Sequence, residues 1–254
     1  MKASRILSME QLILQRGSVS MEELCEHFDV SMNTVRRDVA ELLRRGTAEK
    51  VYGGVCARRS EHSLTPYEVR RISSEEAKIA VGRRAAELVH DGDVIYIDSG
   101  TTTLQMIDFL ADRKDITIIT NNLEAIIRCL PHENITVIAL PGQLRRKTNS
   151  LTGSETVSSI RRYNIRIAFL AATGLSSHGV TNSSSLEYEI KKAATEIAQE
   201  AVLLVDANKF GVTGLMTFAP VSAFDAVVTD KQPAEEYRTL LSSAGAELLC
   251  AADK

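Results

Sequence analysis

A chain of 254 residues has room for one or two domains, and a hydrophobic content of 44% with a charged content of 25% is typical of a soluble globular protein. No apolar run reaches the roughly 18 residues of a membrane-spanning helix, and the amphipathic N-terminus carries Glu10, which excludes a secretory signal; we expect a cytoplasmic protein with no membrane partner. The net charge of −3 argues against binding nucleic acid with the whole surface, although residues 1–60 hold 10 Lys and Arg against 8 Asp and Glu and the rest hold 20 against 25.

Residues 1–58 are predicted to form three helices and a β-hairpin. The helices cover residues 4–16, 20–28 and 31–45, and the apolar face of the first holds Ile6, Leu7, Met9, Leu12 and Ile13. Ser20 forms a capping box with Glu23, and Ser31 caps the third helix. The tight turn at Gly53-Gly54 then joins two strands, residues 48–52 and 55–58.

The second and third of these helices have the proportions of a helix-turn-helix, with a tight turn at residues 29–30. In that motif the second helix lies in the major groove, where Arg suits guanine and Asn suits adenine, and the hairpin resembles a wing. The candidate DNA-binding residues are Ser31, Met32, Asn33, Thr34, Arg36, Arg37, Lys50, Tyr52 and Gly53. The alternative is a helical bundle with a solvated Arg face, but capping, turn length and the adjacent hairpin together favour a reader of double-stranded DNA.

Residues 59–73 are polar and basic and contain Pro66, which predicts a linker with little structure of its own. Residues 74–254 alternate between helices and apolar strands. The predicted helices cover residues 75–90, 103–113, 123–131, 154–163, 186–200 and 233–244, and the predicted strands cover residues 94–97, 117–120, 136–140, 167–171, 202–205, 226–229 and 247–250. Near-continuous Val, Ile and Leu strands between helices indicate an α/β fold whose mainly parallel, open sheet is covered on both faces.

A strand that runs into the hydroxyl-rich turn Asp98-Ser99-Gly100-Thr101-Thr102 is the strongest local motif of this second region. Backbone N–H groups at a helix start favour an anion. The motif is neither a Walker loop nor a G-x-G-x-x-G fingerprint, so no nucleotide is implied. The alternative interpretation is a plain cap at the start of a helix. Other strands also end in polar or glycine clusters, and in a parallel sheet these ends share the edge where ligands bind. The candidate ligand-binding residues are Asp98, Ser99, Gly100, Thr101, Thr102, Asn121, Asn122, Gly142 and Lys209.

Other polar residues give weaker signals. The four cysteines and five histidines are dispersed without metal-ligand spacing, so we expect reduced, mostly buried thiols, no metal and no cofactor. Residues 145–147 are interpreted as a solvated basic loop, with ligand contact as the alternative. Glu187, Glu189, Lys191 and Lys192 are expected on an exposed helix face.

The motifs at residues 31–38, 53–54, 98–102, 120–122 and 206–211 resemble, in order and over nearly the full length, the DeoR family of sugar-metabolism repressors. The resemblance implies that Arg36, Arg37 and Asp38 lie on the recognition helix, with Asp38 in a structural role. It implies a C-terminal domain similar in fold to ribose-5-phosphate isomerase and glucosamine-6-phosphate deaminase, which senses a phosphorylated sugar or polyol. The resemblance also makes Thr181 and Glu187, near the start of the helix predicted over residues 186–200, weaker ligand-binding candidates. The chain departs from the family at Tyr52, where the family often has His, and at Gln143, where the family often has a second glycine.

Two functional classes are compatible with this organisation, a DNA-binding regulator and a sugar-phosphate enzyme. A single helix-turn-helix domain buries too little surface to select one genomic site, so a repressor needs paired half-sites on DNA. We therefore expect a homo-oligomer, either a dimer or a tetramer. A sugar-phosphate isomerase or deaminase needs a positioned general base, but residues 171–175, at the position of the isomerase's acidic segment, contain no carboxylate. We therefore expect a ligand-controlled DNA-binding regulator, with no catalytic residues.

Overall fold

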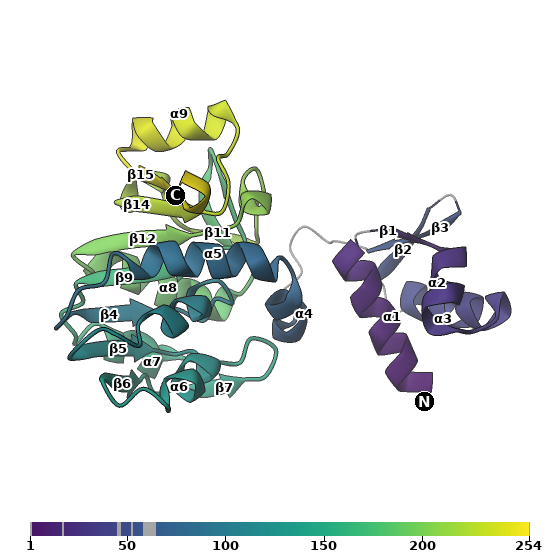
Figure 1. The fold of residues 1–254 in the computed structure, drawn as a ribbon, viewed down its shortest axis with the longest axis horizontal. Helices are drawn as coiled ribbons and strands as arrows, with labels where there is room; N and C mark the ends of the chain where they lie inside the picture. The colour runs from purple at the N-terminus through teal and green to yellow at the C-terminus, as the bar shows by residue number, and fades with distance from the viewer. Residues whose placement is uncertain (1, 17, 45–46, 52, 58–64, 254) are drawn as a thin grey trace. The chain divides into compact units, whose positions relative to one another are not determined.

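The computed structural model describes residues 2–16, 18–44, 47–51, 53–57 and 65–253 (Figure 1). Contacts divide the chain into two compact units, residues 1–63 and 64–254. Each unit has a separate hydrophobic core. Tyr52, one of the candidate DNA-binding residues, lies outside the described residues.

The N-terminal unit is a three-helix bundle closed by a small antiparallel sheet. Its elements are α1 (Lys2–Arg16), β1 (Ser18–Ser20), α2 (Met21–Phe28), α3 (Met32–Arg44), β2 (Ala48–Val51) and β3 (Gly54–Ala57). The predicted capping box is present, since Ser20 and Glu23 exchange hydrogen bonds with each other's backbone. Two details differ from the prediction: β1 adds a third strand beside β3, and Leu7 is 55% exposed, outside the apolar face of α1.

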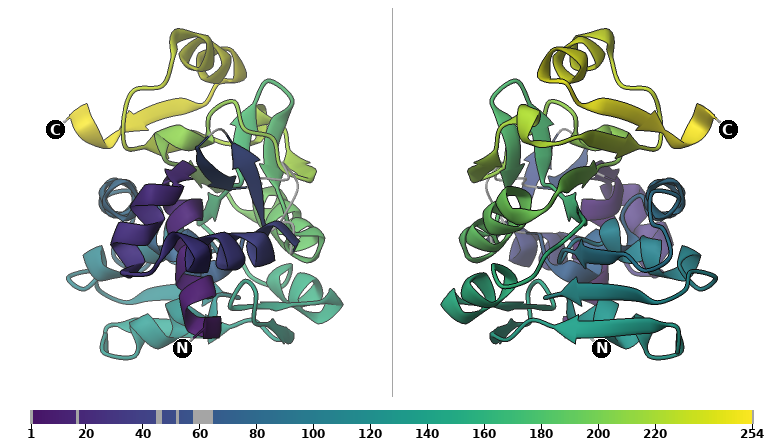
Figure 2. Two further views of the ribbon diagram at one scale, coloured as in Figure 1. Left: turned by 90° about the vertical axis from the view of Figure 1, so that its right-hand side faces the viewer. Right: turned by 90° about the vertical axis from the view of Figure 1, so that its left-hand side faces the viewer.

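A seven-stranded parallel sheet forms the centre of the C-terminal unit, in the order β15-β14-β12-β9-β4-β5-β6. Figure 2 shows β15, in yellow, and β6, in teal, at opposite edges. The strands are β4 (Val94–Ile97), β5 (Ile116–Thr120), β6 (Ile135–Ala139), β9 (Ile167–Ala171), β12 (Glu200–Leu204), β14 (Ala226–Thr229) and β15 (Glu247–Cys250). Every predicted strand is present, and the predicted α/β fold class is confirmed.

Helices cover both faces of this sheet, as predicted from its apolar strands. One core lies beneath α4 (Tyr67–Ile72), α5 (Glu75–Ala86), the 3-10 helix η1 (Thr103–Phe109) and α6 (Leu123–Cys129). The other lies beneath α7 (Ser154–Ile160), α8 (Ser185–Ile197) and α9 (Glu235–Ala244). Figure 1 shows α5 across the near face and α8 behind the sheet.

Short strands and α4 depart from the sequence prediction. The additional strands are β7 (Gln143–Arg145), β8 (Ser150–Thr152), β10 (Gly174–Ser176), β11 (Gly179–Asn182) and β13 (Met216–Ala219); β7 pairs with β8, and the other three form a small sheet. The expectation of an unstructured linker over residues 59–73 is wrong for Tyr67–Ile72, which form α4. Burial of Tyr67 in the core supplies stabilisation that a six-residue helix lacks by itself.

Candidate functional site

The third helix of the N-terminal unit presents a polar face to solvent. Its buried residues are Val35, Asp38, Val39 and Leu42, so the opposite surface is free of core contacts. On that surface Asn33, Arg36 and Arg37 are exposed, and the Ser31 hydroxyl accepts a hydrogen bond from the Thr34 amide at 3.3 Å. The first turn of α3 contains no acidic residue, which leaves the helix start favourable for a phosphate.

Asp38 has the structural role that the resemblance implies. Its side chain is 1% exposed and accepts a hydrogen bond from Arg5 Nε of α1 at 2.7 Å. This ion pair joins α3 to α1, whereas Arg36 and Arg37 are exposed. On the hairpin, Lys50 is exposed on β2 and Gly53 has a φ of +76°, the left-handed conformation that a tight turn demands.

In the C-terminal unit the buried carboxylate of Asp98 organises the turn that follows β4. Its Oδ1 accepts hydrogen bonds from Gly100 N and Thr103 Oγ1, both at 2.7 Å. Its Oδ2 accepts one from Ala171 N at 2.9 Å and pairs with the ammonium of Lys191. Both oxygens are thus engaged within the protein, and Asp98 ties the turn to β9 and α8.

Two further polar side chains from the strand ends, Asn121 and Asn122, are similarly engaged. Asn121 accepts from the Tyr96 hydroxyl at 2.9 Å and donates to the Leu151 carbonyl at 3.0 Å. Asn122 caps α6 through its oxygen and donates to the Asp98 carbonyl at 3.2 Å. These amides build the turn rather than leave free atoms beside it.

Thr101 and Thr102 retain unused hydrogen-bonding capacity in this turn. Within the described part of the chain, neither amide nitrogen has an acceptor, and the Thr102 hydroxyl has no partner. The Thr101 hydroxyl makes one long bond, 3.5 Å, to the Arg70 carbonyl. Adjacent donors of this kind are suited to an anion.

A buried lysine shares an acceptor, the Arg70 carbonyl, with the Thr101 hydroxyl of this turn. Lys78 of α5, which is 4% exposed, donates from Nζ to the carbonyls of Arg70 and Ser73. Burial, and next the charge of Lys209 on η2 (Ala207–Lys209), lower the pKa of Lys78 to about 8. Lys209 was expected at this edge, but Lys78 was missed because its apolar neighbours in the sequence look like an ordinary helix face.

Glu187 and Lys191 correct the expectation of an exposed face on α8. Both are 4% exposed, whereas Glu189 and Lys192 are exposed as predicted. Glu187 accepts hydrogen bonds from the hydroxyls of Ser99, at 2.6 Å, and Ser150, at 2.9 Å. Glu187 and Lys191 are four residues apart, in register with the buried side of α8, and this spacing was the signal in the sequence that both side chains are buried.

Two glycines at this edge are required by close packing. A Cβ on Gly100 would lie 2.4 Å from the Ala171 side chain, so the turn can approach β9 only with glycine there. Gly142 has a φ of +151°, and a Cβ would lie 2.4 Å from Thr156 Oγ1. Gly142 therefore shapes the β6–β7 connection, and no side chain there can reach a ligand.

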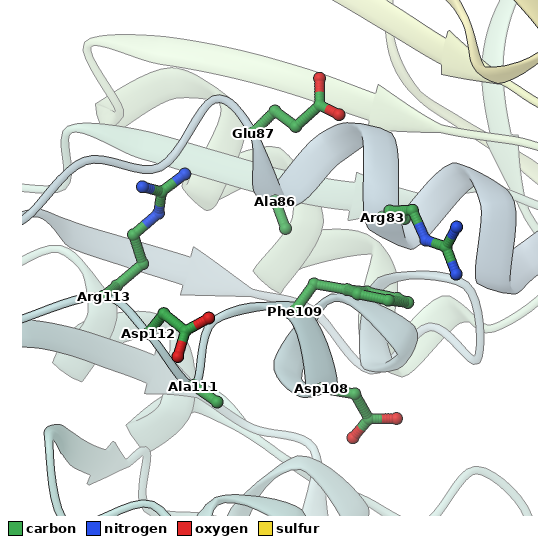
Figure 3. A pocket seen from close by; sticks show the side chains of 8 residues that line it. All are labelled: Arg83, Ala86, Glu87, Asp108, Phe109, Ala111, Asp112 and Arg113. Atoms are coloured by element: carbon green, nitrogen blue, oxygen red, sulfur yellow. The ribbon is translucent and has the colours of Figure 1, made fainter. Parts of the chain in front are cut away.

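A shallow hollow of about 300 Å³ lies elsewhere, between the end of α5 and the end of η1 (Figure 3). Arg83 lies over the Phe109 ring at 5.0 Å from its centre, and the rim carries charges of both signs. The residues after this hollow lead into the start of β5, so it belongs to the edge opposite the Asp98 turn. Among the described residues there is no cluster of metal-ligating side chains and no helix that could cross a membrane.

Comparison with known families matches both units. Residues 5–61 match the DeoR-like helix-turn-helix domain, and residues 73–231 match the DeoR C terminal sensor domain. The chain belongs to the DeoR family. We refer to its two parts below as the helix-turn-helix unit and the sensor unit.

Relatives of this DeoR-family chain are named as transcriptional regulators, not as enzymes. It is 43% identical to the HTH-type transcriptional regulator IolR of Bacillus subtilis, over 93% of this chain and 94% of that protein. It is 32% identical to the glycerol-3-phosphate regulon repressor of Escherichia coli, over 88% of each. A solved ribose-5-phosphate isomerase in complex with phospho-erythronic acid matches 54% of each chain with a TM-score of 0.41 and 19% identity, a level that supports no functional inference.

Proposed function

We propose that this DeoR-family regulator represses a carbohydrate-utilisation operon, and that a phosphorylated sugar or polyol bound to the sensor unit lowers its affinity for operator DNA. The observation that carries the effector part is the turn at Thr101 and Thr102, whose amides have no acceptor among the described residues while Lys78 and Lys209 stand nearby. A phosphate dianion would supply the missing acceptors.

The effector contacts divide into two groups in this proposal. Ser99, Gly100, Thr101 and Thr102, with Lys209, form the anion site. Asp98, Asn121 and Asn122 hold the turn in shape, because their polar atoms are bonded within the protein. Glu187 belongs to this second group, because its Oε1 already accepts hydrogen bonds from the hydroxyls of Ser99 and Ser150.

Thermal unfolding in the presence of sugar phosphates, each paired with its unphosphorylated parent, tests the effector site. A ligand at 100 times its dissociation constant adds about 2.7 kcal/mol to the native state, which raises the midpoint of the sensor unit by roughly 5–11 °C. Thr102→Val removes a hydroxyl that has no partner in the described chain, so we expect normal folding and a reduced shift. Thr136→Val, on the exposed face of β6, is the matched control. A shift from the parents as well as the phosphates would contradict an anion site.

DNA binding is proposed to use the N-terminal face of α3, with Ser31, Met32, Asn33, Thr34, Arg36 and Arg37 at the groove and with Lys50, Tyr52 and Gly53 on the wing. Arg36→Ala and Arg37→Ala should each weaken binding to a DNA fragment selected from genomic DNA, by about 1–3 kcal/mol where the Arg reads a base. Arg16→Ala, an exposed arginine at the end of α1, should leave binding unchanged. Unchanged affinity in both α3 variants would refute this assignment.

Paired half-sites require more than one helix-turn-helix unit, so the regulator is a homo-oligomer, a dimer or a tetramer, in this proposal. Light scattering on the protein and on its operator complex measures this directly. A monomer with full operator affinity would contradict it.

A further inference from the structure

Helix α4 occupies a particular place in the chain. It is the first described helix after residues 58–64, and it falls between the stretches that match the two family domains, residues 5–61 and 73–231. Any signal that travels along the backbone from the sensor unit to the helix-turn-helix unit must pass through it.

Both ends of α4 are held by the sensor unit. At its start, Tyr67 N donates to the Lys147 carbonyl at 2.9 Å, and the Tyr67 side chain is buried in the core. At its end, the carbonyls of Arg70 and Ser73 accept hydrogen bonds from Lys78 Nζ. The Arg70 carbonyl is also the group that the Thr101 hydroxyl approaches at 3.5 Å.

Two donors therefore meet at the Arg70 carbonyl near the end of α4, Lys78 Nζ and the Thr101 hydroxyl, and the second belongs to the proposed anion site. A six-residue helix has too few internal hydrogen bonds to persist alone, and a cation on its last carbonyls is a substantial part of what stabilises it. The ammonium of Lys78 prefers a dianion to two neutral carbonyls, because charge-assisted hydrogen bonds to phosphate are the stronger ones.

The observed arrangement of α4 also leaves a polar group unsatisfied. Arg70 Nη2 is buried and has no hydrogen-bond partner among the described residues. A buried donor without an acceptor is costly. A different position of α4 that gives Arg70 Nη2 an acceptor would recover this cost.

We propose that α4 is the element through which effector binding reaches the helix-turn-helix unit, and that Lys78 is the residue that switches. An anion at Thr101 and Thr102 draws the Lys78 ammonium and the Thr101 hydroxyl away from the Arg70 and Ser73 carbonyls, and the C-terminal end of α4 is released. This inference rests on the proposed anion site and adds the step by which its occupancy is transmitted.

Hydrogen exchange of the full-length protein tests the proposal without any variant. The probe is inorganic phosphate at tens of millimolar, compared with chloride at the same ionic strength. We expect slower exchange in residues 98–105 and, at the same time, roughly tenfold faster exchange in residues 67–73, the effect of losing one charge-assisted hydrogen bond. Slower exchange in the turn with unchanged α4 would refute the coupling and leave the anion site standing. No slowing in the turn would refute both.

Lys78→Met separates a switch from a structural contact. In this variant α4 should exchange at the phosphate-bound rate of the wild type, with or without phosphate, and phosphate should no longer change operator affinity. Lys114→Met, an exposed lysine at the opposite edge of the sheet, should respond to phosphate as the wild type does. A normal phosphate response of both α4 exchange and operator affinity in Lys78→Met would overturn the role of Lys78. If the variant does not fold, the wild-type comparison decides.

Discussion

Lys191→Met removes one partner of the buried ion pair that organises the sensor turn. The two side chains are 5% and 1% exposed, so the carboxylate of Asp98 would remain buried without its cation. Breaking such a pair costs about 3–5 kcal/mol. Asp98 keeps three neutral donors, from Gly100, Thr103 and Ala171, so the lower end of this range applies. At about 3 kcal/mol, the unfolding midpoint of a unit of this size falls by roughly 6–12 °C.

Scanning calorimetry suits this measurement, because the two units can unfold in separate transitions and the sequence contains no Trp for fluorescence. Only the transition of the sensor unit should move. Lys192→Met, the exposed neighbour on the same helix, should change stability by less than about 0.5 kcal/mol. A loss below about 1 kcal/mol in Lys191→Met would refute the conclusion that this pair carries the turn. The double variant with Asp98→Asn should be less destabilised than the sum of the two single variants.

Four further predictions concern Lys78, Gly100 and Arg5. The pKa of Lys78 is lowered to about 8, so its charge is lost as pH rises through that value, and phosphate affinity should fall about tenfold from pH 7 to pH 9 in titrations at constant ionic strength, a step absent from Lys78→Met. Burial of Lys78 costs stability while its charge must be removed on folding, and this cost shrinks as pH rises from about 8 to the ordinary pKa of 10.5. The free energy of unfolding of the free protein should therefore increase over this range, which urea unfolding can follow. Gly100→Ala should abolish the phosphate-induced thermal shift, because its Cβ would lie 2.4 Å from the Ala171 side chain; an undiminished shift would contradict the tight turn. Arg5→Met should lower the midpoint of the helix-turn-helix unit by leaving Asp38 buried and unpaired, and an unchanged calorimetric midpoint would contradict that pairing.

Local signals in the sequence were sufficient for the layout of the molecule. The strands at residues 94–97, 167–171, 226–229 and 247–250 have the predicted bounds, because short apolar runs between helices leave few alternatives. The Ser20 capping box is correct because all of its partners lie within three residues of one another. Parallel strands also fix which ends share an edge, so the location of the turn at Ser99–Thr102 followed from the sequence.

Which polar groups are free within that turn was decided by the tertiary structure alone. Asp98 meets Lys191 across 93 positions and Ser99 meets Glu187 across 88, and no local pattern indicates such partners. The same is true of α4, which exists because distant residues bury Tyr67 and because Lys78 binds its last carbonyls. A sequence specifies hydrogen bonds between neighbours through propensity and spacing, whereas bonds between distant residues depend on the packing of the whole sheet.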